Sequence, residues 1–137
     1  MSVRNPYQAY KQTAVETASP GDLTLMLYSG CLNFIKQGKA AMEAGQIAEK
    51  NTYLQKAQDI IRELMVTLDT RYEVAQNMMR MYDYILHRLI EANIKNDPTI
   101  LNEVEDYISQ FQETWKQVLQ INRQKQYGGG GTDGTRL

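Results

Sequence analysis

Apolar side chains recur every three or four positions through most of the chain, which is the spacing of one face of an α-helix. The clearest run lies within residues 47–69 and consists of Leu54, Ala57, Ile61, Leu64 and Leu68. A seam of this kind is what helices pack along in a bundle. The pattern therefore predicts a helix over about 47–69.

Two further helices are predicted downstream, separated by the sequence "NDP". The stripe within 73–95 consists of Val74, Met78, Tyr82, Ile85, Leu89 and Ala92, and the stripe within 98–125 consists of Leu101, Val104, Ile108, Phe111, Trp115 and Val118. Asp97 is a good N-cap residue and Pro98 suits the first helical position, so the chain is expected to start a new helix there.

The first helix opens the stretch "SPGDLTLMLYSGCLNFI" and carries apolar residues on two sides. We expect it to begin with Ser19 or Asp22 as N-cap and to end near Ala44, with Gly45 as the C′ residue. One broad side consists of Leu23, Met26, Leu27, Cys31, Phe34 and Gly38, and a second side consists of Leu25, Tyr28, Leu32 and Ile35. Leaving the second side in water forfeits ~1.5–3 kcal/mol for each large side chain.

Three explanations of this second side stay open. The helix is central and touches neighbours on both sides, or the second side binds a partner, or it mediates self-association as a weak homodimer. In the partner interpretation the N-terminal segment covers the site at rest, with Tyr7 and Tyr10 as apolar plugs.

The linkers between the predicted helices are short, so neighbouring helices should run antiparallel. We predict an all-α fold: an antiparallel four-helix bundle forming one domain over residues 1–127. Residues 1–18 are too short for a stable independent helix and are predicted to form a short N-terminal helical cap. Residues 128–137 are rich in glycine and are predicted to be a disordered tail.

Charge and composition exclude some classes of binding partner. The 15 Lys and Arg residues nearly balance the 16 Asp and Glu residues, which gives a formal net charge of -1. No long-range field is implied, so nucleic acid and anionic membranes are not favoured. The chain shows neither a secretion signal at its start nor 18 consecutive apolar residues, so membrane insertion is not expected.

Catalytic and metal-binding patterns are absent from the sequence. A di-iron bundle needs two Glu-x-x-His motifs, whereas His87 is the single histidine. Cys31 is the single cysteine and lies within an apolar helix, without a spacing-linked histidine that would activate it. We therefore expect no enzyme activity and no cofactor. A histidine phosphotransfer bundle that uses His87 is the alternative function.

Three blocks of sequence resemble one known family. They are "QAY" at 8–10, "VETASPGDLTLMLYSG" at 15–30 and "MYDYILHRLIEANIKND" at 81–97, and "NEVEDYISQFQETWKQ" at 102–117 continues the match. Together they resemble the flagellin export chaperones of the FliS family over about residues 5–120. The chain departs from the family at Ser29, where Asp is frequent, and at His87, where Arg is frequent.

The resemblance implies a cytoplasmic export chaperone without a cofactor. Family members bind the C-terminal segment of flagellin, prevent its premature polymerization and assist its delivery to the flagellar export gate. The resemblance also implies that the N-terminal cap, with Tyr7 and Tyr10, yields to the client. Leu25, Tyr28, Leu32 and Ile35 are then expected to form a docking stripe for an amphipathic client segment.

Overall fold

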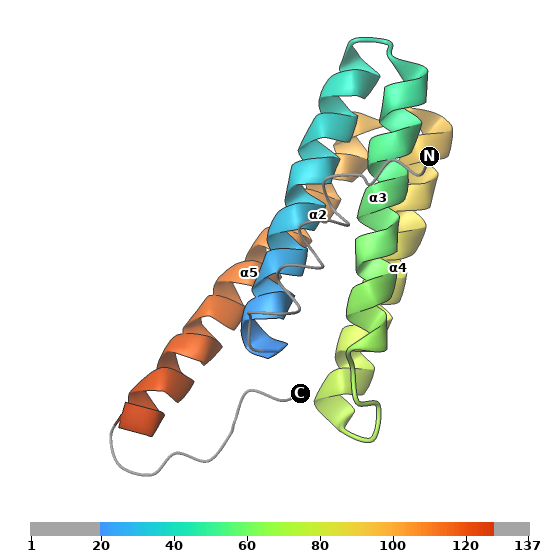
Figure 1. Ribbon diagram of the computed structural model, residues 1–137. Helices are drawn as coiled ribbons and strands as arrows, with labels where there is room; N and C mark the ends of the chain where they lie inside the picture. The colour runs from blue at the N-terminus through green and yellow to red at the C-terminus, as the bar shows by residue number, and fades with distance from the viewer. Residues whose placement is uncertain (1–19, 128–137) are drawn as a thin grey trace, which may run out of the picture.

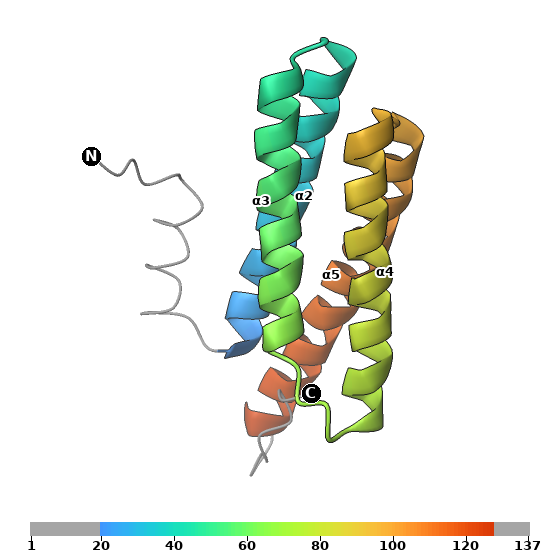
Figure 2. The ribbon, with the colours of Figure 1, turned by 90° about the vertical axis from the view of Figure 1, so that its right-hand side faces the viewer.

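The computed structural model describes residues 20–127, and this part of the chain forms four helices (Figure 1). They are α2 (Pro20–Glu43), α3 (Ile47–Val66), α4 (Glu73–Lys95) and α5 (Pro98–Tyr127). Consecutive helices run in opposite directions (Figures 1 and 2). The predicted antiparallel four-helix bundle is confirmed. The predicted cap at 1–18 and tail at 128–137 lie outside the described residues.

The turn between α2 and α3 follows the predicted glycine. Gly45 has a φ of 74°, in the left-handed region that glycine enters without steric cost. The N–H of Gln46 donates to the carbonyl of Ala41 at 2.9 Å, and the N–H of Gly45 donates to the carbonyl of Met42 at 3.2 Å. This pair of bonds is the Schellman motif, which satisfies carbonyls at a helix end. At its other end α2 already begins at Pro20, so Asp22 lies in the first turn instead of being its N-cap.

Helix α3 ends at Val66, three residues before the predicted end. The hydroxyl of Thr67 donates to the carbonyl of Leu64 at 2.6 Å. Asp69 then accepts a bond from the backbone N–H of Arg71 at 3.2 Å. Side chains of Thr and Asp that bond to nearby backbone compete with continued helix, and this competition explains the early end.

The turn between α4 and α5 follows the "NDP" sequence. Asn96 adopts a left-handed conformation with a φ of 53°, and the N–H of Asp97 donates to the carbonyl of Ala92 at 3.2 Å. A carboxylate oxygen of Asp97 accepts a bond from the N–H of Thr99 at 2.9 Å. Asp97 is therefore the N-cap of α5, as predicted, with Pro98 at the first helical position.

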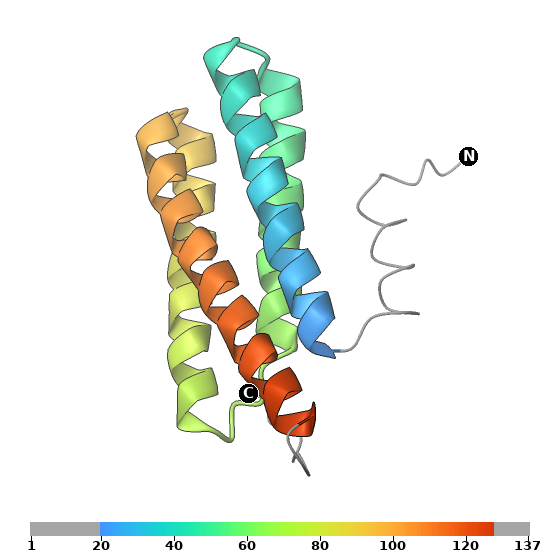
Figure 3. The same cartoon turned by 90° about the vertical axis from the view of Figure 1, so that its left-hand side faces the viewer.

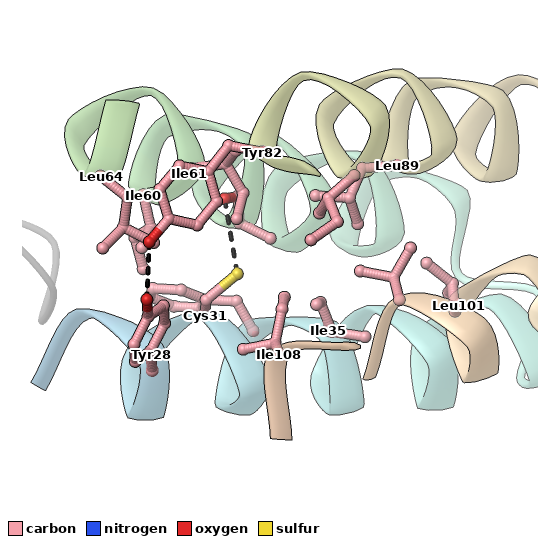
Figure 4. Packing of buried hydrophobic residues seen from close by; sticks show 14 of the residues in the cluster. Tyr28, Cys31, Ile35, Ile60, Ile61, Leu64, Tyr82, Leu89, Leu101 and Ile108 are labelled. Carbon is pink, nitrogen blue, oxygen red and sulfur yellow. Dashed lines mark hydrogen bonds between the residues drawn. The ribbon is translucent and has the colours of Figure 1, made fainter. Parts of the chain in front are cut away.

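The four helices stand around one core. Helix α2 packs against α3 and α5, and α4 also packs against α3 and α5, so α2 and α4 stand across a diagonal without close backbone contact. The core contains side chains from all four helices, including Ile35, Ile60, Ile61, Leu89 and Leu101 (Figure 4).

Candidate functional site

A layer of aromatic side chains fills the bundle between the diagonally opposed helices α2 and α4. The hydroxyl oxygens of Tyr28 on α2 and Tyr82 on α4 lie 2.6 Å apart, and Figure 4 shows the two side chains meeting across the core. The ring of Phe111 on α5 lies 6.2 Å from the ring of Tyr28 and 6.0 Å from that of Tyr82. Burial raises the pKa of both tyrosines above the usual value of the phenol.

The structure corrects half of the predicted docking stripe. Tyr28 is 2% exposed and Ile35 is fully buried, so both belong to the core and present no surface to a client in the described structure. At ~100° per residue, each lies only about 40–60° around the helix from the buried Cys31. The sequence interpretation was wrong because it assigned these neighbours of the core face to an opposite side.

Leu25 and Leu32 are half-buried and lie on the side of α2 that faces α5. On that side the Ser29 hydroxyl accepts a bond from the Gln112 amide at 2.6 Å, and the Lys39 ammonium contacts Glu105 at 2.5 Å. Helix α2 is thus central, with α3 on one side and α5 on the other. Of the three sequence explanations, this central position accounts for most of the second apolar side. Tyr7 and Tyr10 lie outside the described residues.

The start of α2 is held tightly to the later part of α5. The indole N–H of Trp115 donates to the carbonyl of Gly21 at 2.8 Å in a buried contact. A Cβ atom added at Gly21 would lie 2.4 Å from Leu119 Cδ2, so glycine permits this close approach. Leu119 is buried although the sequence stripe did not include it.

Helix α5 contacts α2 along its length, from Glu105 to Trp115, whereas its polar contacts with α4 in the described part of the chain lie near its start. Near its start, Glu103 accepts bonds from Tyr84 at 3.0 Å and Arg88 at 2.8 Å, both on α4. Tyr107 also packs edge-to-face on Tyr84. From Gln112 onward the polar contacts of α5 described above are with α2. Figures 1 and 3 show the consequence, because α5 diverges from α4 and crosses toward the start of α2.

Apolar side chains remain uncovered where α4 and α5 part. Val74 is 51% exposed, and Met78, Phe111 and Val118 are only half-buried, although all four lie on predicted core stripes. Ile121, which no sequence stripe included, is 52% exposed. In the sequence, this surface is indicated by apolar stripes on α4 and α5 that continue past the point where the two helices part.

The titratable side chains offer little chemistry. His87 is exposed, and its Nδ1 lies 2.8 Å from the carbonyl oxygen of Asp83. Cys31 is buried, and burial raises the pKa of its thiol, which disfavours the nucleophilic thiolate. Within residues 20–127, no three His, Cys, Asp or Glu side chains gather as metal ligands. In the same part of the chain, no helix combines the length and the apolar character that crossing a membrane requires.

A family described as "Flagellar protein FliS" matches residues 3–122, which is most of the chain. The chain belongs to the FliS family. This membership confirms the resemblance inferred from the sequence blocks. FliS proteins are chaperones rather than enzymes, so the expectation of a non-enzymatic export role is confirmed as well. Nothing in the family assignment supports the phosphotransfer alternative at His87.

Several FliS proteins are similar to the chain over most of their length. The flagellar secretion chaperone FliS of Bacillus subtilis is 50% identical over 131 residues, which cover 96% of this chain and 98% of that protein. The protein of the same name from Vibrio cholerae is 35% identical over 122 residues, which cover 85% of this chain and 90% of that protein. The protein of the same name from Salmonella typhimurium is 36% identical over 118 residues, which cover 81% of this chain and 87% of that protein.

Proposed function

We propose that this FliS protein binds the C-terminal segment of flagellin in the bacterial cytoplasm. In this role it prevents premature polymerization of flagellin and assists its delivery to the flagellar export apparatus. The observation that carries the proposal is the family match over residues 3–122, together with relatives that are named flagellar secretion chaperones.

The physical basis of the proposal is competition for one apolar surface. A segment that assembles through an amphipathic helix cannot assemble while its apolar side is buried on another protein. Such a segment is disordered when free, so ordering it on the chaperone costs free energy that apolar burial must outweigh. That cost keeps the complex weaker than its contact area suggests, which suits a client that must be released for export.

The client contacts that we retain from the sequence are Leu25 and Leu32 on α2, together with Tyr7 and Tyr10 in the N-terminal segment. Leu25 and Leu32 are half-buried at the margin of the α2–α5 contact, where a client side chain can cover their remaining surface. Tyr28 and Ile35 are no longer candidates because they are core residues.

A binding experiment with two forms of flagellin tests the proposal. Immobilised chaperone should retain full-length flagellin in a one-to-one complex and should fail to retain flagellin that lacks its C-terminal segment. Circular dichroism of the immobilised preparation serves as the control for folding. Equal retention of the two forms would place the contact elsewhere on flagellin, and retention of neither by the folded chaperone would refute the proposed client.

A further inference from the structure

Helix α4 is held unevenly along its length. Its second part contributes four buried side chains: Tyr82, Ile85, Leu89 and Ala92. Among residues 73–81, in contrast, Ala75 alone is buried. We propose that residues 73–81, which we name the opening segment, unwind locally while the remainder of the bundle stays folded. This inference concerns a conformational device of the fold and does not depend on the proposed function.

The C-terminal end of α4 is fixed by Lys50 of α3. This lysine is 3% exposed, which is rare for a charged side chain. Its ammonium donates to the carbonyl oxygen of Asn93 at 2.9 Å and to the side-chain oxygen of Asn96. Both acceptors lie at the end of α4, where unpaired carbonyls and the helix dipole favour a positive charge. Lys50 therefore acts as a C-terminal cap that α3 supplies to α4.

Two further contacts hold the second part of α4. The hydroxyls of Tyr28 and Tyr82 meet in the core. Glu103 of α5 accepts bonds from the side chains of Tyr84 and Arg88. Together with the Lys50 contact, these bonds join the part of α4 from position 82 onward to each of the other three helices. Unwinding this part would break all of them.

The side-chain hydrogen bonds of the opening segment stay local within the described part of the chain. The Arg80 guanidinium donates to the Asn77 amide in the same helix, and the Gln76 amide donates to the carbonyl of Thr70 in the preceding turn at 2.9 Å. Figures 1 and 3 show that α5 has diverged from α4 beside this segment. Unwinding the opening segment therefore breaks fewer contacts with other helices than unwinding the second part of α4.

The start of α4 lacks the kind of cap that its end has. Its N-cap residue is Tyr72, whose side chain makes no capping hydrogen bond. Residues such as Asp and Ser are preferred at this position because their side chains accept bonds from the first N–H groups of the helix. Glu73 in the first turn favours the helix start only through the interaction of its charge with the helix dipole. The opening segment thus begins at the less secured end of the helix.

Unwinding would uncover one end of the core. Ala75 is fully buried, and the half-buried Met78 packs against the core cluster. Because Tyr82 follows the opening segment directly, water would then reach the layer in which Tyr82 meets Tyr28. Little apolar burial opposes this opening, since Ala75 is a small side chain. The bundle therefore has one end that opens without unfolding the core.

Hydrogen exchange of the full chain, followed by mass spectrometry, tests the opening segment. Amides of residues 77–81, which lie beyond the unpaired first turn of α4, should exchange about tenfold faster than those of residues 85–92 after correction for intrinsic rates. Low concentrations of urea should accelerate exchange in 85–92 more than in 77–81, because local unwinding exposes less surface than global unfolding. Equal protection and equal urea dependence of the two ranges would overturn the proposal.

A variant at the fixed end shows whether the two parts of α4 open separately. K50M removes the cap that α3 supplies, so exchange of residues 93–96 should become about tenfold faster while residues 77–81 stay unchanged. K36M replaces an exposed lysine on α2 and serves as the matched control. Equal acceleration of both ranges by K50M would show that α4 opens as one unit and would overturn the proposal.

A pair of variants at the start of α4 tests the missing cap. Y72D supplies a preferred N-cap residue and should slow exchange of residues 77–81 by about fivefold. Y72L removes the same tyrosine without supplying a cap and should leave this exchange unchanged. Tyr72 is 54% exposed, so neither change disturbs the core. Equal exchange of residues 77–81 in Y72D and Y72L would contradict the inference, because the missing cap would then have no part in the opening.

Discussion

At the scale of single residues, Tyr28 and Tyr82 make a buried polar contact within the apolar core. It joins α2 and α4 across the diagonal of the bundle, where these helices make no close backbone contact. Each hydroxyl is removed from water and has the other as its partner. The pair therefore specifies how these two helices face one another more than it adds net stability.

Removing one hydroxyl of this pair should lower the free energy of unfolding more than removing both. Y28F or Y82F alone leaves a buried hydroxyl without its partner, and we expect a loss of about 1–3 kcal/mol in the free energy of unfolding. The double variant Y28F/Y82F replaces both with apolar groups of similar shape and should lie closer to the parent than either single variant. Urea unfolding of the four proteins measures the cycle. Losses that simply add in the double variant would mean that the hydroxyls do not depend on one another.

The sequence predicted residues well where local chemistry determines them. Gly45 and Asp97 were identified because a left-handed turn and an N-cap each favour few residue types. Tyr28 was misassigned because a tyrosine at the border of a helix face suits both a core and a binding surface. Tyr28 lies in the core because it pairs with Tyr82, which is 54 residues away in the chain. No local sequence pattern reveals that partner.

At the scale of the helices, α2 approaches α3 closely at Gly38. A Cβ atom there would lie 2.6 Å from Leu54 Cδ2 and 3.0 Å from its Cγ. Gly30 lies two turns earlier, where an added Cβ would meet only Ile60 Cδ1 at 3.4 Å. The two glycines therefore serve the helix pair differently although both lie within α2.

Alanine at these two positions should change stability in opposite directions. G38A forces Leu54 to move and should cost about 1–3 kcal/mol through overpacking. G30A meets an ordinary contact and should stabilise by up to about 1 kcal/mol, because alanine favours the helix more than glycine does. Thermal melting compares both with the parent. A stabilised G38A would show that the helices separate easily at this point, contrary to the close packing described.

The helices themselves were predicted closely, but their arrangement was not. Periodic apolar residues gave the bounds of α4 correctly, and α3 ended early because Thr67 and Asp69 bond to nearby backbone. The divergence of α5 from α4 could not be predicted, because the stripe from Leu101 to Val118 is uniform. Its cause is tertiary: Trp115 and Leu119 fit against Gly21 and hold the second half of α5 on α2.

At the scale of the whole molecule, the bundle combines a fixed core with incompletely covered apolar sides. The core is closed by residues of all four helices, whereas Val74 and Ile121 remain about half exposed where two helices part. Surface of this kind on a FliS protein suits the burial of an assembly-prone segment of another chain. We propose that this burial keeps flagellin from polymerizing.

Seeded polymerization of flagellin, followed by light scattering, tests whether the chaperone has this effect. We expect the chaperone to suppress the growth of scattering in proportion to its amount, with full suppression near a one-to-one ratio. Excess free C-terminal flagellin peptide should restore growth, because it competes for the same surface. Growth at an undiminished rate in the presence of a molar excess of correctly folded chaperone would show that the chaperone does not keep flagellin from polymerizing.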